Sequence, residues 1–327
     1  MSSKPLNYRM NKNSKIYIAG HKGLVGSAIT RLLKKEGYKN LILKTRQDLD
    51  LLNQQAVTDF FKKEKPEYVF LAAAKVGGIM ANKTFSANFI YENLQIQNNI
   101  IHQSYLSGVK KLLFLGSVCI YPKLCPTPVK EECLLSDRLE PTNEPYAIAK
   151  IAGLKMCQSY NRQYGTNFIG IMPANLYGYN DNFDLNNSHV LPAMIRKFHE
   201  AKENDLREII LWGSGKPRRE FLFVDDMADS CLFAMNEFDP TAKQNENGEI
   251  FFNVGAGKDV TIKELSELVK KIVGFKGKIK WDKTKPDGTP KRLLDISKSK
   301  KFGWKPKTDL AEGIKMTYDW YKMRNNE

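Results

Sequence analysis

The chain has 327 residues, of which 42% are hydrophobic and 27% are charged. This composition is typical of globular proteins and excludes disordered, collagen-like and repeat-biased chains, and the length is sufficient for two lobes sharing a core. No uninterrupted apolar stretch approaches the roughly 20 residues that a bilayer crossing requires, and the amino terminus is polar. We therefore expect a soluble protein that is not exported and does not bind a membrane.

The net charge of +15 at pH 7 is spread along the chain. The basic residues occur as singles and pairs, so we do not expect nucleic-acid binding, and an anionic small molecule is the alternative partner. The cysteines are odd in number and lack CxxC spacing, which indicates reduced thiols in a cytoplasm and no metal site. They are Cys119, Cys125, Cys133, Cys157 and Cys231.

The first half of the chain alternates short apolar runs with segments of helical spacing. Residues 15–19 form the first predicted strand and residues 24–33 the first helix. Further strands are expected near 41–45, 68–73, 111–116 and 168–173, with helices at 84–106 and 146–163. This alternation predicts an α/β fold with a Rossmann-type, doubly wound parallel sheet covered by helices on both faces.

The pattern changes after Gly178, where a polar loop precedes a helical segment, 190–202, and a strand-like run, EIILWG. Residues 220–224, a helix from Asp225 and a strand at 250–254 are expected to return to the sheet. We therefore predict a Rossmann domain of residues 14–180 and 219–256, and a smaller, discontinuous α/β substrate-binding domain of residues 181–218 and 257–327.

Gly20, Gly23 and Gly26 form a GxxGxxG pattern between the first predicted strand and the first helix. Without side chains the backbone can approach a pyrophosphate, whose charge the amino end of the helix favours. This context predicts a dinucleotide site. A tight strand-to-helix turn without a ligand is the alternative.

The end of the second predicted strand indicates which dinucleotide is bound. An NAD enzyme places an acid there for the ribose 2′-hydroxyl, whereas this chain has Lys44 and Arg46, with Lys22 in the glycine loop. These cations favour NADP(H), because they attract a 2′-phosphate. Solvated surface charge is the alternative, and Asp48 and Asp50 leave NAD open.

Tyr146 and Lys150 form a YxxxK pair on a segment of helical composition, so the phenol and the ammonium lie one turn apart on one face. A neighbouring ammonium lowers the pKa of a phenol toward the range useful for proton transfer. Ser117 follows the fourth predicted strand, at the carboxyl edge where open α/β sheets bind ligands. The three residues predict a hydride-transfer triad.

Blocks of sequence that include these motifs and extend well beyond them carry a family resemblance. They are GHKGLVGSA (20–28), LAAAKVGGI (71–79), LGSVCIYP (115–122), EPTNEPYAIAKIAG (140–153), NLYG (175–178), NSHVLPA (187–193) and REFLFVDDMA (219–228). From about residue 14 onward the chain resembles the extended short-chain dehydrogenase/reductase family and, within it, the GDP-L-fucose synthases. The resemblance implies NADPH-dependent reduction at C4 of a GDP-linked 4-keto sugar with coupled C3/C5 epimerisation, in a homodimer paired through segments 84–106 and 146–163. A cofactor-binding regulator without chemistry is the alternative of a different class.

Epimerisation requires two further proton-transfer groups, because one proton leaves one face of the sugar carbon and another arrives on the opposite face. In the family these groups are a cysteine and a histidine, and the matching positions are Cys119 and His189. Cys119 lies two residues after Ser117, so both side chains point the same way if the extended geometry persists. A packed core thiol and a cofactor-contacting or capping imidazole are the alternatives.

The resemblance also implies binding residues. Those implied for the cofactor are Gly20, Lys22, Gly23, Leu24, Val25, Gly26, Arg46, Ala73, Leu115, Gly116, Lys150, Pro173, Asn175, Leu176 and His189. GDP requires cations for its diphosphate and a flat surface for guanine. Those implied for GDP are Lys197, Trp212, Arg219, Lys285 and Asp287.

Three features depart from the family pattern. Val118 stands where the family usually has a second serine, Arg218 adds a cation beside Arg219, and residues 179–185 replace a Pro-His-rich loop that borders the sugar pocket. These departures leave the sugar and the retention of both epimerisations open. The alternatives are a reductase acting at C4 alone, or an enzyme for a related GDP-4-keto-heptose in surface polysaccharide biosynthesis.

Overall fold

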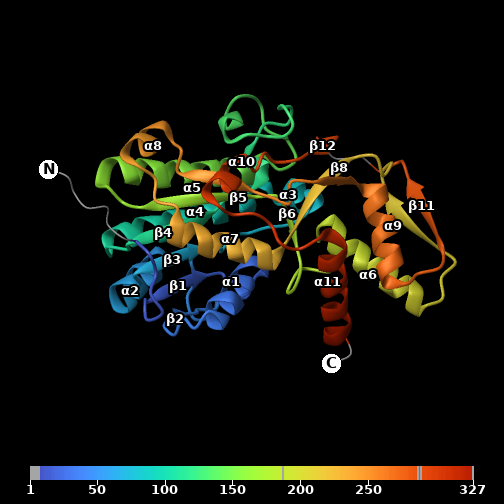
Figure 1. The fold of residues 1–327 in the computed structure, drawn as a ribbon, viewed down its shortest axis with the longest axis horizontal. Helices are drawn as coiled ribbons and strands as arrows, with labels where there is room; N and C mark the ends of the chain where they lie inside the picture. Colours follow the sequence, from blue (N-terminus) through green and yellow to red (C-terminus); the bar gives the residue numbers. More distant parts are fainter. Residues whose placement is uncertain (1–7, 186–187, 286, 288, 326–327) are drawn as a thin grey trace.

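The computed structural model describes residues 8–325 except 186–187, 286 and 288. Its main feature is a six-stranded sheet of order β2-β1-β3-β4-β5-β9, in which every neighbouring pair is parallel (Figure 1). The strands are β1 (Ile16–Ala19), β2 (Leu41–Ile42), β3 (Tyr68–Leu71), β4 (Lys111–Leu115), β5 (Phe168–Pro173) and β9 (Phe251–Val254). The predicted doubly wound α/β fold is confirmed.

Helices cover both faces of this sheet because successive strand side chains point to opposite faces. Tyr17 and Ala19 belong to the core formed with α2 (Gln54–Glu64), α4 (Ser86–Leu106) and α5 (Glu144–Tyr164). Ile16 and Ile18 belong to the core on the other face, formed with α1 (Leu24–Lys35) and α7 (Val224–Glu237). Among the described residues, no helix is long and apolar enough to cross a bilayer.

A second lobe, on the right in Figure 1, has its own core. It contains a sheet of order β10-β8-β12 with β6 paired to β8, and a parallel pair of β7 and β11. The strands are β6 (Asn175–Tyr177), β7 (Glu208–Trp212), β8 (Arg218–Phe223), β10 (Asp259–Thr261), β11 (Lys278–Asp282) and β12 (Lys291–Arg292). The helices that fill its core are α6 (Val190–Glu203), α9 (Ile262–Val273) and α11 (Leu310–Asn325).

Short helices complete the chain. They are α3 (Ile79–Thr84), α8 (Ala242–Asn247), α10 (Ser297–Phe302), and the 3-10 turns η1 (Val118–Ile120) and η2 (Glu131–Cys133). Helix ends follow local chemistry, as in α9, where Thr261 accepts a hydrogen bond from the Glu264 N–H and Gly274 adopts φ +81° after the last turn.

The prediction that residues 220–224 return to the main sheet is wrong, whereas β9 does return, beside β5. β5 ends at Pro173, which has no backbone N–H, and the chain continues into β6 outside the sheet. β6 then offers an edge on which β8 pairs in parallel. The second predicted strand is also shorter than expected, ending at Ile42.

Candidate active site

The glycine loop is shaped by close backbone contacts. A Cβ on Gly26 would lie 2.1 Å from the Gly20 carbonyl oxygen, and one on Gly20, at φ +85°, would lie 2.8 Å from the backbone of Ala73. Gly23 is the N-cap of α1 and supplies no side-chain cap, so the N–H groups of Leu24 and Val25 point out of the helix end. This cradle, with an uncapped helix end, fits the pyrophosphate of a dinucleotide.

Exposed cations lie after β2 and in the glycine loop, and the carboxylates after β2 already accept hydrogen bonds from neighbouring residues of the chain. Arg46 and Lys22 are exposed. The Asp48 carboxylate accepts hydrogen bonds from the Thr45 N–H (2.9 Å) and hydroxyl (2.7 Å), and these bonds lower its pKa. Asp50 accepts one from the Leu52 N–H (3.1 Å). The residues present therefore fit a ribose 2′-phosphate better than a free ribose hydroxyl, which needs an available acid.

Ser117, Tyr146 and Lys150 lie together beyond the carboxyl end of β4. The Lys150 ammonium donates to the Leu115 carbonyl oxygen (2.7 Å) and lies 5.8 Å from the centre of the Tyr146 ring. Burial lowers the pKa of Lys150 to about 8. Contrary to the expectation from the YxxxK pair, the pKa of Tyr146 is raised: burial and the Cys119 sulfur raise it, and a hydrogen bond with Ser117 opposes them. Tyr146 is therefore protonated at neutral pH and available as a proton donor.

Cys119 is joined to this group through Ser117 and Asn143. Its backbone N–H donates to the Ser117 hydroxyl (3.2 Å), and the Asn143 amide donates to its sulfur (3.3 Å). Burial raises the pKa of the Cys119 thiol, whereas Ser117 and the positive charge of Arg292 lower it. The thiol is therefore held by polar neighbours, unlike an inert core cysteine.

The expectation of extended geometry from Ser117 to Cys119 is wrong. β4 ends at Leu115, and the Ser117 hydroxyl caps the 3-10 turn η1 that contains Cys119. The proximity of the two residues comes from this turn and its capping bond instead of from strand alternation.

His189 is the N-cap residue of α6, and its side chain makes no capping hydrogen bond. The side chain is exposed to solvent, yet enough protein surrounds the ring that burial lowers its pKa. It is therefore neutral at pH 7 and able to donate or accept a proton. Among the described residues, no hydrogen bond links it to Ser117, Cys119 or Tyr146.

The remaining predicted cofactor residues lie along the same carboxyl edge of the sheet. Gly116 is packed so closely that a Cβ would lie 2.1 Å from the Met172 sulfur. Pro173 ends β5, and the Asn175 amide donates to the Glu220 carbonyl oxygen (2.8 Å). Leu176 packs against the core that contains α1 and α7.

The predicted GDP residues form a group in the second lobe. Trp212 is 58% exposed at the end of β7, with the ammonium groups of Lys197 and Lys285 at 5.6 and 5.5 Å from its ring centre. The Asp287 carboxylate accepts from the Ser214 N–H (2.8 Å) and hydroxyl (2.6 Å), so it fixes a loop beside this ring. Arg219, on β8, donates to the Arg218 carbonyl oxygen (2.8 Å).

The departures from the family pattern have structural roles. Arg218 donates to the Asp259 carboxylate (2.9 Å), so its charge is neutralised. In the 179–185 loop, the rings of Tyr179 and Phe183 contact Trp320 of α11. Asn180 donates to the Ser27 hydroxyl of α1 (3.1 Å). The loop therefore packs against α1 and α11, and the contacts of its aromatic rings are with α11 and not with a sugar pocket.

Two polar residues of the site were not predicted. Asn143 precedes the YxxxK pair and binds Cys119; its signal was its place before a helix whose second residue is proline. Arg292, on β12, lies in register with Arg219 of β8. Its positive charge opposes the burial that raises the pKa of Cys119, and it adds to the burial that lowers the pKa of Arg219. No spacing in the sequence indicates that Arg292 and Cys119 are neighbours.

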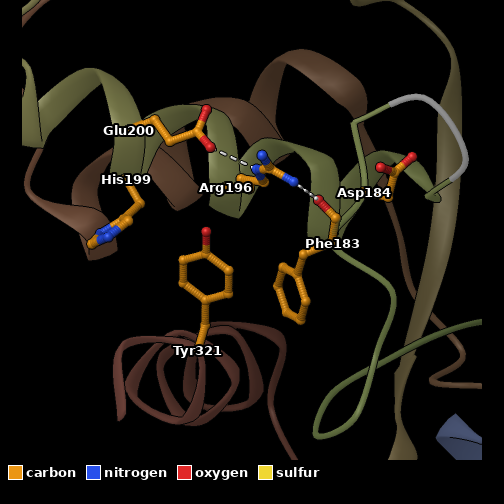
Figure 2. Close-up of a pocket in the computed structure, with 6 residues that line it drawn as sticks. All are labelled: Phe183, Asp184, Arg196, His199, Glu200 and Tyr321. Carbon is orange, nitrogen blue, oxygen red and sulfur yellow. Dashed lines mark hydrogen bonds and ion pairs between the residues drawn. The ribbon is translucent and has the colours of Figure 1, made fainter. Parts of the chain in front are cut away.

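A separate cavity of about 500 Å³ lies between α6, α11 and the 179–185 loop (Figure 2). Arg196 donates there to the Glu200 carboxylate (2.6 Å) and to the Phe183 carbonyl oxygen (3.3 Å). None of the predicted site residues lines it. We therefore assign the active site from the clustered proton-transfer groups and not from this cavity.

Comparison with known proteins shows the family to which the chain belongs. Residues 16–255 match the model of the NAD-dependent epimerase/dehydratase family. The chain is 58% identical over 311 residues to GDP-L-fucose synthase 1 of Arabidopsis thaliana, which covers 95% of this chain and 94% of that protein. The chain therefore belongs to the NAD-dependent epimerase/dehydratase family.

Solved structures from Campylobacter jejuni are also similar. A GDP-6-OMe-4-keto-L-xylo-heptose reductase has a TM-score of 0.92 at 47% identity, covering 97% of this chain and 100% of that one. A GDP-mannoheptose C4 reductase with NADP bound has a TM-score of 0.88 at 48% identity, covering 96% and 99%. The fold is thus shared with structures that are described as reductases of GDP-linked heptoses.

Proposed function

We propose that this protein is an NADP-dependent enzyme that reduces C4 of a GDP-linked 4-keto sugar and epimerises C3 and C5, as GDP-L-fucose synthases do. The observation that carries the proposal is the cluster of Ser117, Cys119, Tyr146 and Lys150 at the edge of the sheet that holds the glycine loop. This cluster unites a proton donor for reduction with a second acid/base group.

For reduction, Tyr146 gives its phenolic proton to the C4 oxygen, and Ser117 holds that oxygen with its hydroxyl. NADPH, when bound, supplies the hydride. The Lys150 ammonium beside the Tyr146 ring stabilises the phenolate left behind. The Leu115 carbonyl oxygen fixes the ammonium in this position.

For epimerisation, Cys119 and His189 transfer protons at carbons that the neighbouring carbonyl acidifies. Asn143 fixes the Cys119 sulfur, and the positive charge of Arg292 opposes the burial that raises the pKa of the thiol. His189 is neutral and solvent-accessible, so it can exchange its proton with water between the two steps. The proton balance requires one group to remove a proton and the other to return one.

Binding of the two nucleotides follows the two lobes. We assign the cofactor to the lobe of the six-stranded sheet, predicted as residues 14–180 and 219–256, with Lys22 and Arg46 at the 2′-phosphate. We assign the GDP-sugar to the second lobe, predicted as residues 181–218 and 257–327, to whose sheet β6 and β8 also belong. Trp212 offers a flat surface for guanine, and Arg219 with Lys197 and Lys285 offers charge for the diphosphate.

We also propose a homodimer that pairs through α4 and α5. Large apolar side chains are exposed on these helices, with Tyr91 63%, Leu106 59%, Ile148 41% and Tyr164 45% exposed. Such a surface is typical of an interface. A cytoplasmic location fits the five cysteines, all of which have free thiols.

A second candidate is reduction at C4 alone, with a GDP-4-keto-heptose as substrate. The observation in its favour is the similarity, at 47% and 48% identity, to the two GDP-heptose reductases of Campylobacter jejuni. One additional carbon group changes discrimination by about 10- to 200-fold, so both sugars can compete for one site. The ratio of kcat/KM for the 6-deoxy-hexose and the heptose separates the two candidates.

The test of the main proposal is the addition of a GDP-4-keto-6-deoxy-hexose to the protein with NADPH. We expect NADPH consumption and a product whose configuration at C3, C4 and C5 NMR assigns as epimerised and reduced. Tyr146→Phe is the negative control and Tyr38→Phe, between α1 and β2 and away from both the site and the proposed interface, is the positive control. A product reduced at C4 but unchanged at C3 and C5 favours the second candidate, and no consumption overturns both.

A further inference from the structure

Asn143 lies at the start of α5, where the helix makes no use of its side chain. Its backbone is fixed on both sides, because its N–H donates to the Glu140 carbonyl oxygen (3.2 Å) and its carbonyl oxygen accepts from the Ala147 N–H (3.0 Å). An asparagine at an N-cap position ordinarily accepts a hydrogen bond from the N–H of the second or third helical residue. Here the second residue is Pro145, which has no N–H, and the Asn143 side chain makes no capping bond. The side chain therefore serves another purpose.

The two ends of the Asn143 amide have different surroundings. The nitrogen, Nδ2, donates to the Cys119 sulfur (3.3 Å). The oxygen, Oδ1, is buried, and none of the residues that the structure describes donates a hydrogen bond to it. Both atoms are bonded to the same carbon, so the oxygen lies beside the thiol, three residues before Tyr146 along the chain. The site thus contains a buried hydrogen-bond acceptor next to its proton-transfer groups.

A buried acceptor of this kind indicates where the donor of a ligand belongs. Nearly all buried polar atoms of folded proteins are hydrogen-bonded, and the exceptions are expected to have a specific reason. An amide oxygen that is removed from water without a donor costs free energy. A bound molecule with a hydroxyl group removes this cost, because the hydroxyl donates to the oxygen.

The chemistry proposed for Cys119 identifies that hydroxyl. Cys119 acts at C3 and C5, the two carbons that flank the C4 carbonyl. In a hexopyranose, C5 carries the ring oxygen and C6, whereas C3 carries a hydroxyl. The 3-hydroxyl is therefore the sugar donor attached directly to a carbon at which the thiol acts. An amide that holds the sulfur with its nitrogen presents its oxygen to the same part of the sugar.

We propose that Asn143 is a specificity-determining residue whose Oδ1 accepts a hydrogen bond from the 3-hydroxyl of the GDP-linked sugar while its Nδ2 positions the Cys119 sulfur. One amide then recognises the substrate and orients the thiol that acts on it; the assignment rests on the proposed function. A sugar without the 3-hydroxyl leaves Oδ1 unpaired, so we expect it to bind roughly tenfold more weakly.

The experiment compares two GDP-linked 6-deoxy-hexoses that are already reduced at C4, one with and one without the 3-hydroxyl. Calorimetry measures their binding to the full-length protein saturated with NADPH, a complex in which neither sugar reacts because no carbonyl remains. In the unmodified protein we expect the 3-hydroxyl to strengthen binding roughly tenfold, and in Asn143→Ala we expect the two sugars to bind equally. Asn143→Asp retains an acceptor oxygen and should keep most of the preference.

Three results overturn the assignment of Oδ1. They are equal binding of the two sugars to the unmodified protein, a preference that persists in Asn143→Ala, and a loss in Asn143→Ala of NADPH affinity instead of sugar preference, which assigns the oxygen to the cofactor. Thr241→Ala is the matched control, because Thr241 is the N-cap of α8 and its hydroxyl accepts from the Gln244 N–H (3.3 Å). It should lower thermal stability without changing the ratio of the two affinities.

Deuterium exchange separates the two ends of the amide. Asn143→Asp lacks the N–H that donates to Cys119, so we expect exchange at C3 and C5 of the keto sugar to fall roughly 10- to 100-fold while the preference for the 3-hydroxyl remains. A merely structural role predicts that both change together, and undiminished exchange in Asn143→Asp overturns the positioning of Cys119. NADPH consumption with equal binding of the two reduced sugars overturns this inference alone. Unequal binding without any NADPH consumption on the keto sugar overturns the proposed function alone.

Discussion

Backbone atoms shape the glycine-loop edge of the main sheet, whereas side chains shape the Trp212 end of the second lobe. At the glycine loop, a Cβ on Gly26 would lie 2.1 Å from the Gly20 carbonyl oxygen. At Trp212, the ring is 58% exposed and two lysine ammonium groups lie over it. A site made of close backbone contacts fails abruptly when one atom is added, and a site made of exposed side chains weakens by degrees.

The largest effect is expected from Gly26→Ala. The added methyl group must displace the backbone of Gly20, and a misplacement of about 1 Å can cost roughly 100-fold in kcat/KM. Lys35→Ala, at an exposed position in the last turn of the same helix, is the matched control. Titration with NADPH and steady-state kinetics measure both variants. Equal losses in the two variants would contradict the claim that the backbone shapes this edge.

Arg46→Glu is expected to reverse the cofactor preference. Loss of a charge-assisted hydrogen bond to the 2′-phosphate costs roughly 10- to 100-fold in kcat/KM for NADPH, and the value for NADH changes little. Lys39→Glu, an exposed lysine before β2, is the control for charge alone. If the unmodified protein uses NADH and NADPH equally well, the assignment of Arg46 is wrong.

The pH dependence of reduction is set by Lys150. Burial lowers its pKa to about 8, so the ammonium that supports Tyr146 is lost as the pH rises through that value. We expect kcat/KM, which reports the free enzyme, to fall roughly tenfold per pH unit above it. In Lys150→Arg the cation persists, and the fall is expected to disappear. A fall that persists unchanged in Lys150→Arg would assign it to another group.

The smallest effect is expected at Trp212 in the second lobe. Trp212→Ala removes an exposed stacking surface and should raise KM for the GDP-sugar about fivefold without changing kcat. Trp212→Phe, which retains a ring, is expected to recover most of the affinity. A large fall in kcat, or no change in KM, would remove Trp212 from the nucleotide site.

The sequence predicts the glycine-loop edge well because its signals are local. Strand, glycines and helix follow one another within about 20 residues, and the structure places β1, the loop and α1 as expected. The contacts that the sequence does not predict join distant segments. Asn143 reaches Cys119 from the start of α5, and Arg292 reaches Cys125 from β12.

Two of the incorrect predictions, for Cys119 and for β8, have the same origin. The 3-10 turn at Cys119 depends on a capping bond to Ser117, and the place of β8 depends on pairing with β6, β10 and β12. Neither the turn at Cys119 nor the position of β8 can be predicted from the spacing of apolar residues, because that spacing indicates only which face of an element is buried. The residues around Trp212 are implied by the family resemblance and not by any spacing in the sequence. They come from three separate segments: α6, β7 and the loop after β11.

The proposed site performs two separable chemistries, and solvent deuterium exchange in the Cys119→Ser variant distinguishes them. In deuterium oxide, we expect the unmodified protein to incorporate deuterium at C3 and C5, and Cys119→Ser to lose roughly 100- to 10,000-fold of that rate. NADPH-dependent reduction of an already epimerised keto sugar should remain close to that of the unmodified protein, because Ser117, Tyr146 and Lys150 are intact. An unmodified protein that exchanges neither proton, or a variant that loses exchange and reduction equally, would contradict the account.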